Sequence, residues 1–329
     1  MDKVSIAEVA KLVHVGRATV SRALNNSGYV SAGTRAKIDE AVKTLGYRQN
    51  MLAKKLRTNQ SRFVGLVIPD IANDFFARMA KCIESTLQAS GYGLFLCNSE
   101  ENQTKENFYI TTLIDNQVEA IIITPSTKNI NSKLIKTEMP VVFADRIVTE
   151  RSPHFACVTS DNIRGGCLAA QKFIDTHAKK VIVLKDEREV SSATADRIKG
   201  FESTIAGKDI AYEIYNVPVS PESGYSCMQR IIGTATVFDA VFCTSDMLAI
   251  GAVKCLTDQH ISVPSDVQLL GFDGMSLVPY LPLALSTIVQ NVEAMGKAIG
   301  QTVLAMIEKQ QFSPLTVFPV SLVERETTK

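Results

Sequence analysis

Apolar residues follow two different patterns along this chain, and the change falls near residue 62. Before it, they recur every three or four residues, which is the spacing of one helical face. After it, they form short continuous runs rich in β-branched side chains, which is typical of strands buried on both faces. The pattern therefore predicts a small helical module over residues 1–49 and a larger α/β body from residue 63.

Residues 5–25 predict two short helices joined by a tight turn. Ser5 and Glu8 form a capping box at the start of the first helix. Its apolar stripe comprises Ile6, Val9, Ala10 and Val13. The second helix runs from about Arg17 to Leu24 and buries Val20 and Leu24. The residues left facing outward are Arg17, Ala18, Ser21 and Arg22. This is the arrangement in which a second helix lies in the major groove of DNA, where an arginine fork matches a guanine edge.

A third helix is predicted between a cap at Ser31 and a stop at Gly46. Its apolar face comprises Ile38, Ala41, Val42 and Leu45. Three such helices can close a small core, but a unit of this size is only marginally stable.

Charge divides the chain at the same place as hydrophobicity. Residues 1–62 carry twelve Lys/Arg against four Asp/Glu, a net charge of +8, whereas the remaining residues carry 23 against 30, a net charge of −7. A compact basic module with a helix-turn-helix pattern is the electrostatic signature of a nucleic-acid-binding domain. The simpler alternative is a solvated basic face.

The body from residue 63 alternates strands with helices. Its apolar runs are FVGLVI, YGLFLC, EAIIIT, PVVFA, KVIVL, AVFCT and VQLLGF. Helix-length segments such as 74–90, 163–176 and 246–258 separate them. This alternation predicts a parallel sheet covered by helices on both faces. The body is too long for one core, so two lobes are expected.

The stretch VGRATVSRALN, followed by LGY and Asn50, resembles the LacI/GalR family of bacterial repressors. The resemblance covers nearly the whole chain. It implies a small all-α helix-turn-helix headpiece and an α/β, periplasmic-binding-protein-like core of two doubly wound parallel-sheet subdomains. It also implies a sequence-specific regulator that represses a carbohydrate-utilisation operon. The headpiece residues it assigns to DNA are Ser5, Arg17, Ala18, Thr19, Ser21, Arg22 and Asn25.

Two residues of the turn depart from the family pattern. His14 stands where the family usually has Gly, and Gly16 stands where it usually has Ser. Histidine is among the few non-glycine residues enriched at positive φ, and Gly is an acceptable N-cap, so the turn is expected to form.

Residues 50–62 are predicted to be a hinge helix and linker. Eight helical residues, NMLAKKLR, are too few to be stable alone, so we expect ordering only on DNA. In the family this helix enters the minor groove and wedges an apolar side chain between base pairs. The matching residue here is Leu56, and the further DNA contacts implied are Asn50, Ala53, Lys54 and Lys55. The alternative is an ordinary linker helix with Leu56 in a crevice.

The resemblance divides the body, residues 63–329, into two subdomains. The first comprises about 63–159 and 291–320, and the second about 160–290 and 321–329. The chain then crosses between them near Thr159, Gln290 and Val320. A ligand is expected in the cleft at the carboxyl ends of the strands.

Polar residues follow several predicted strands and are the candidate effector-binding residues. They are Asp70, Asn73, Asp145, Arg146, Asp161, Ser245, Asp246 and Asp273. The family resemblance supports Asp145, Asp161 and Asp273 and adds Phe75, Phe76, Arg197 and Gln290. Carboxylates accept, and guanidinium groups donate, the hydrogen bonds of a polyol. The alternative is that Asp161 and Asp246 only cap helices and that Phe76 belongs to the core.

Three further departures bear on the ligand. Asp74 replaces a family proline, Ser245 replaces a longer amide, and Val219 stands where many sugar-binding members have an aromatic residue. Basic residues near the cleft, Arg146, Arg188 and Arg197, lead to the hypothesis that the effector is a sugar acid or sugar phosphate.

Other functional classes find little support in the sequence. The chain lacks the GxSxG, P-loop, HExxH and GxGxxG motifs, and its four histidines have no ligand spacing. We therefore expect no enzyme, no cofactor and no metal. No apolar run could span a bilayer, and the N-terminus lacks the features of a signal peptide, which argues against an exported solute-binding protein. Seven cysteines without CxxC pairs are typical of a reducing cytoplasm.

One headpiece reads too few base pairs to select an operator, so we expect a homodimer on palindromic double-stranded DNA. The apolar segment 275–285 is a candidate interface, or else a packed loop, and no heptad tail follows that could form tetramers. We expect a small carbohydrate-type effector to release the operator. Corepression uses the same parts and remains the alternative.

Overall fold

The computed structural model describes residues 4–25, 27–47, 61–127, 131–135, 137–188 and 192–329. The chain divides into two compact units, a headpiece over residues 1–61 and a core over residues 62–329. The predicted hinge helix, with its expected DNA contacts at Asn50, Ala53, Lys54, Lys55 and Leu56, lies outside the described residues.

The headpiece consists of α1 (Ile6–Val13), α2 (Arg17–Asn25) and α3 (Ala32–Leu45). One apolar cluster joins them, with Val9, Val20 and Ile38 completely buried at its centre. The predicted capping box is present, because the Glu8 carboxylate accepts from both the backbone N–H and the hydroxyl of Ser5. Each predicted helix therefore buries the face that its spacing indicated.

The turn between α1 and α2 forms in spite of its unusual residues. His14 adopts the left-handed conformation at φ 54° and ends α1. The carbonyl of Gly16 accepts the first helical hydrogen bonds of α2, from the N–H groups of Thr19 and Val20. Ser31 caps α3 as expected, and Gly46 ends it at φ 62°.

The core contains two six-stranded sheets, which we call the first and second lobes together with their helices. The first sheet is parallel throughout, in the order β11-β5-β4-β3-β1-β2. Its strands are β1 (Phe63–Ile68), β2 (Gly93–Asn98), β3 (Ala120–Ile123), β4 (Val141–Ala144), β5 (Phe155–Ser160) and β11 (Leu315–Phe318). The helices of this lobe are α5 (Asp74–Ala89), α6 (Gln103–Asp115), α7 (Ser132–Ile135) and α12 (Val292–Ile307).

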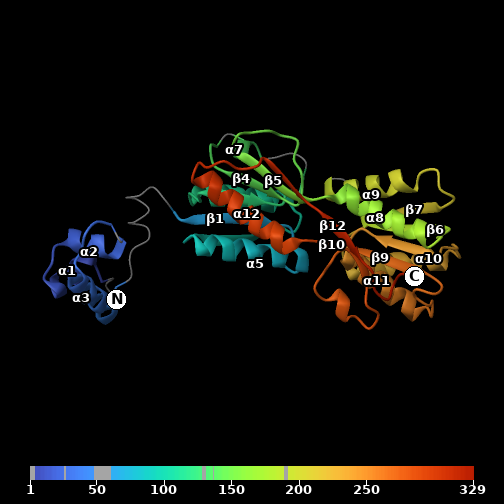
Figure 1. Cartoon of the computed structure of the whole chain (residues 1–329), viewed down its shortest axis with the longest axis horizontal. Helices are drawn as coiled ribbons and strands as arrows, with labels where there is room; N and C mark the ends of the chain where they lie inside the picture. Colours follow the sequence, from blue (N-terminus) through green and yellow to red (C-terminus); the bar gives the residue numbers. More distant parts are fainter. Residues whose placement is uncertain (1–3, 26, 48–60, 128–130, 136, 189–191) are drawn as a thin grey trace. The chain divides into compact units, whose positions relative to one another are not determined.

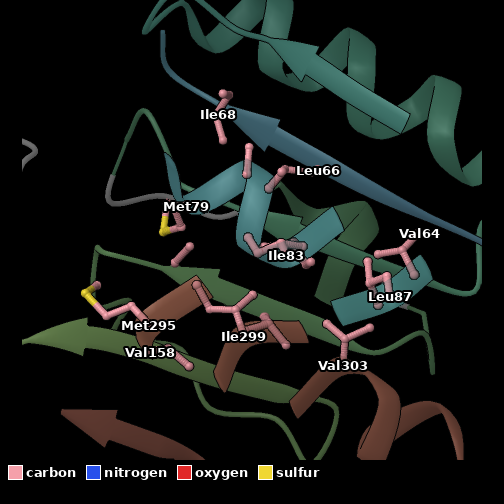
Figure 2. Packing of buried hydrophobic residues seen from close by; sticks show 14 of the residues in the cluster. Val64, Leu66, Ile68, Met79, Ile83, Leu87, Val158, Met295, Ile299 and Val303 are labelled. Carbon is pink, nitrogen blue, oxygen red and sulfur yellow. The ribbon is translucent and has the colours of Figure 1, made fainter. Parts of the chain in front are cut away.

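Helices cover both faces of the first sheet, as the continuous apolar strands require. On one face α5 and α12 pack against alternate residues of β1, β3 and β4, and α6 packs on the opposite face. Figure 2 shows Met79, Ile83 and Leu87 of α5 beside Met295, Ile299 and Val303 of α12. The two helices approach so closely at Gly296 that a Cβ atom there would lie 2.8 Å from the Met79 carbonyl oxygen. The absence of a side chain at this position therefore permits the close packing.

The second sheet has the order β12-β10-β9-β8-β6-β7, with only the β10–β12 pair antiparallel. Its strands are β6 (Lys180–Asp186), β7 (Ala211–Val217), β8 (Ala240–Cys243), β9 (Gln268–Asp273), β10 (Ser286–Gln290) and β12 (Val320–Val323). Its helices are α8 (Asn162–Asp175), α9 (Ser192–Ile205), α10 (Pro221–Gly233) and α11 (Asp246–Asp258), with a 3₁₀ turn at η1 (Val278–Tyr280). Helices α8 and α9 cover one face, and α10 and α11 cover the other.

The chain passes between the two sheets three times, from β5 to α8, from β10 to α12 and from β11 to β12 (Figure 1). The last passage lies between Phe318 and Val320, because Val320 already pairs with Gln290 in the second sheet. The fold class expected from the sequence is confirmed. No helix in the described parts of the chain is long and apolar enough to cross a membrane.

Candidate functional site

The outward side of α2 carries the headpiece residues that the sequence predicted for DNA. Arg17, Ala18 and Arg22 are exposed, whereas Val20 and Ala23 on the opposite side are buried. Thr19, Ser21 and Asn25 are half-buried. The Asn25 amide donates to the Ser21 carbonyl oxygen at 2.7 Å, which ties down the last turn of the helix. Ser5 lies apart from α2, at the start of α1, where its hydroxyl donates to Glu8.

A cavity of about 450 Å³ lies between the two lobes of the core, at the carboxyl ends of their strands. This volume is within the range of small-molecule sites. Nine of the twelve predicted effector residues line it: Asp70, Asn73, Phe75, Phe76, Asp145, Arg146, Arg197, Ser245 and Asp273. Val219 also lines it, as the sequence departure implied. The two phenylalanines meet edge to face at 5.1 Å between ring centroids and form one apolar part of the wall.

Among the described residues of the cavity wall, Asp145, Arg146 and Thr244 each have a buried side-chain atom without a hydrogen-bond partner, and the atom in Asp145 is a carboxylate oxygen. Asp145 is 6% exposed, follows β4 directly and has φ 67°, a conformation that costs free energy for a residue with a side chain. Its Oδ1 atom is buried and has no hydrogen-bond partner. Burial raises the pKa of this carboxyl group, although Arg197 and Arg146 oppose the rise. A ligand hydroxyl or amine would supply the missing donor.

Asp273 and Arg197 form a second polar centre. Asp273 ends β9 at φ 112° and accepts hydrogen bonds from Ser245 at 3.0 Å and from Gln290 at 2.8 Å. The Arg197 Nη1 atom lies 3.2 Å from Asp273 Oδ1, and its guanidinium stacks 3.7 Å above the Phe272 ring. Burial raises the pKa of Asp273 to about 6, even though Arg197 lowers it. The Asp273 carboxylate can accept hydrogen bonds from a ligand and the Arg197 guanidinium can donate them. Contacts with Ser245, Gln290 and Phe272 hold both side chains in place.

A third polar cluster joins the lobes at the cavity wall. Arg146 donates two hydrogen bonds to the Glu101 carboxylate, at 2.9 and 2.7 Å, and a third to the Pro125 carbonyl at 2.7 Å. Arg188, from the second lobe, contacts Glu101 and is also held by Asp186. All four charged residues line the cavity.

Comparison with known proteins decides the family. Residues 5–50 match bacterial regulatory proteins of the lacI family, and residues 170–328 match the periplasmic binding protein-like domain. The chain is 31% identical to the ribose operon repressor of Halalkalibacterium halodurans, over 99% of this chain and 97% of that one. It is 30% identical to the sucrose operon repressor of Streptococcus mutans, over 98% of each.

This chain belongs to the LacI family.

Its fold agrees with a solved member of the family. The lac repressor dimer bound to operator and an anti-inducer matches with a TM-score of 0.88 and 23% identity, over 99% of each chain. Among the described residues of this LacI-family chain, no group of His, Cys, Asp or Glu is placed to hold a metal ion.

Three of the predicted effector residues do not reach the cavity wall. Asp161 caps α8 by accepting from the Arg164 N–H at 2.9 Å, which is the alternative that the sequence left open. Asp246 is turned inward and accepts from the Thr287 hydroxyl at 2.7 Å. It does not cap α11, because Ser245 is the N-cap of that helix. Gln290 acts indirectly, by donating to Asp273.

Several residues of the wall were not predicted from the sequence, above all Glu101 and Asp186. Both lie at or just after the end of a predicted strand, where the other candidates were found. That signal was available at NSEE and KDER, but those stretches resemble ordinary charged loops.

A second polar contact joins the lobes at the start of α5. Asp74 accepts from Ser276, and Arg78 donates to the Gly274 carbonyl at 2.9 Å and to Glu293 at 2.7 Å. Asp74, which stands where the family has a proline, therefore bridges the two lobes. The sequence did not indicate this contact.

Proposed function

We propose that this LacI-family protein is a sequence-specific repressor of a carbohydrate-utilisation operon, acting in the cytoplasm as a dimer on a palindromic operator. The observation that carries the proposal is the exposed side of α2, where Arg17 and Arg22 project from a basic module of net charge +8. Arginine forks can read guanine edges in the major groove, and the surrounding charge attracts the phosphate backbone.

The effector proposed is a small carbohydrate bound in the cavity between the lobes. The relatives named above are a ribose and a sucrose operon repressor. The cavity supports the same ligand class, because its wall combines carboxylates with the paired rings of Phe75 and Phe76. The unpartnered oxygen of Asp145 is suited to a sugar hydroxyl.

Regulation follows from linkage between the cavity and the headpiece. A ligand that contacts both lobes favours the lobe arrangement in which it binds best. It can alter DNA affinity only by its preference for one arrangement over the other. We propose that the effector favours the arrangement that releases the operator.

The test uses the full-length chain and a random double-stranded library, from which bound sequences are selected and then measured by fluorescence anisotropy. We expect a palindromic site whose affinity falls steeply with salt and falls again when the cognate sugar is added. A sugar that tightens binding would replace induction by corepression. Failure to bind any duplex in a salt-sensitive manner would overturn the proposal.

A further inference from the structure

The carboxylate of Glu101 lies between two cavity guanidinium groups from opposite lobes. Arg146 grips it with both terminal nitrogens, and Arg188 contacts the same oxygen, Oε1, from the second lobe. Bidentate pairs of this kind are the strongest charge-assisted hydrogen bonds in proteins. Glu101 therefore occupies both terminal nitrogens of Arg146, which an incoming anion would need, and only the buried Nε atom of that guanidinium has no partner among the described residues.

The other cavity cation is occupied as well. Arg197 is shared among Asp273, the Asn162 side chain at 2.9 Å and the Thr244 carbonyl at 2.6 Å. Against three arginines, the wall carries seven carboxylates: Asp70, Glu100, Glu101, Asp145, Asp186, Glu187 and Asp273. Among the described residues that line the cavity, acidic groups thus exceed basic ones, which disfavours an anionic ligand.

The backbone at Glu101 is held in a costly conformation. Glu100 and Glu101 both have positive φ, at 53° and 54°, and neither is a glycine. Non-glycine residues in this region cost of the order of 1 kcal/mol each, and they concentrate at functional sites. This conformation directs the Glu101 side chain, which is only 18% exposed, onto the two arginines.

We propose that Glu101 is a specificity-determining residue that neutralises Arg146 and Arg188 and makes the cavity select uncharged polyols over sugar acids and sugar phosphates. The inference rests on the proposed carbohydrate function of the same cavity. It replaces the interpretation of the arginines drawn from the sequence alone, which was that they bind an anionic effector. Their role is to bind Glu101 and join the lobes, and the ligand meets a wall of acceptors.

The test is isothermal titration calorimetry of the full-length chain with matched sets of ligands. Each set contains a neutral sugar, its aldonic acid and its phosphate, for example D-ribose, D-ribonate and D-ribose 5-phosphate. For the wild-type chain, we expect the neutral member of one set to bind at least about 10-fold more tightly than its anionic partners. The reason is that the charged donors an anion would need are already bound to Glu101.

Glu101→Gln keeps the size of the side chain and removes its charge. We expect the ratio of anionic to neutral affinity to rise by about 10-fold or more, because the two guanidinium groups gain free donors. Glu100→Gln is the matched control. It removes the same charge from the adjacent wall position, where Glu100 pairs with Lys105 at 2.5 Å. We expect it to raise the ratio much less than Glu101→Gln does, because it removes one of the seven wall charges but leaves the contacts of Glu101 with Arg146 and Arg188 in place.

Three outcomes decide the matter. Equal binding of neutral and anionic members by the wild-type chain overturns the inference even if the Gln variant fails to fold. An unchanged ratio in folded Glu101→Gln also overturns it. If the wild-type chain binds no carbohydrate of any charge, the proposed function fails, and the inference fails with it.

Discussion

Asp74 in the first lobe accepts two hydrogen bonds from Ser276 in the second, from its backbone N–H at 2.9 Å and from its hydroxyl at 2.7 Å. Asp74 immediately precedes the cavity residues Phe75 and Phe76, and Ser276 lies three residues after the cavity residue Asp273. The contact therefore connects the two walls of the ligand site directly. A change in lobe angle that separates these two residues would stretch or break it.

The Asp74–Ser276 contact should be measurable as a coupling free energy. We expect Asp74→Ala and Ser276→Ala each to lower the free energy of unfolding, and the double variant to lose less than the sum by about 1 kcal/mol, since the shared contact is lost once. Urea denaturation of the four proteins measures this coupling. Strictly additive losses would show that the contact contributes no stability.

Buried carboxyl groups should make the stability of the core fall as pH rises. Burial, with help from Asp273, raises the pKa of Asp246 to about 8, compared with 3.8 for an ordinary aspartate. Between these values the folded chain holds a proton that the unfolded chain has released. Each unit of rising pH then lowers the free energy of unfolding by up to about 1.4 kcal/mol, and the effect ends above pH 8.

Asp246→Asn is the variant that checks this dependence. Between pH 6 and 8 the unfolding free energy of the wild-type chain should decline, whereas that of the variant should change much less, because the titrating group is gone. Denaturation series at several pH values give both slopes. Parallel slopes would mean that another group controls the pH dependence.

Close packing of α8 on α9 should make Gly166 intolerant of a side chain. A Cβ there would lie 1.9 Å from the Arg197 carbonyl oxygen, so Gly166→Ala must displace the backbone that carries Arg197. We expect a loss of about 1–3 kcal/mol in unfolding free energy together with weaker ligand binding. The control is Gly233→Ala, where a Cβ would contact nothing within 4 Å. That substitution should be neutral or slightly stabilising in thermal denaturation.

The two DNA elements should respond differently to loss of a cation. Arg22 is exposed on α2, and Arg22→Ala should cost about 1–3 kcal/mol on the operator with little effect on scrambled duplexes. Lys55→Ala should instead weaken binding to all sequences and reduce the salt dependence of binding. Anisotropy titrations at several salt concentrations distinguish the two. Equal losses on every duplex from both variants would contradict the assignment.

Continuous apolar runs predicted seven strands well, including the partly exposed edge strand β2, whereas strands with interspersed polar residues were missed, including the buried β10. All seven predicted strands are present within a residue or two, since continuous apolar runs have few alternatives to a covered parallel sheet. The edge strand β7 was missed because its outer residues are polar or half-exposed, as at Glu213. The same holds for β11, where Leu315 and Val317 are largely exposed.

Side-chain orientation limited the prediction of the cavity. Position at a strand end led to Asp145 and Asp273, which line the cavity, but it could not show that Asp246 turns inward toward Thr287. Charge was also misleading in the sequence, because Arg146 and Arg188 are neutralised by Glu101, which follows a different strand. Ion pairs between distant segments become visible only once the chain is folded.

The last residues of the chain are integrated into the second lobe. Thr327 is completely buried, and its carbonyl oxygen accepts a hydrogen bond from the Leu269 N–H at 2.7 Å. The Lys172 ammonium donates to the Lys329 carbonyl oxygen at 2.7 Å. A reporter or affinity tag fused directly after Lys329 would therefore begin at the surface of the second lobe, separated by one residue from the buried Thr328, and would report on that lobe alone. Fluorophores for following lobe movement are better attached at exposed helix positions, such as the surface of α6 or α10.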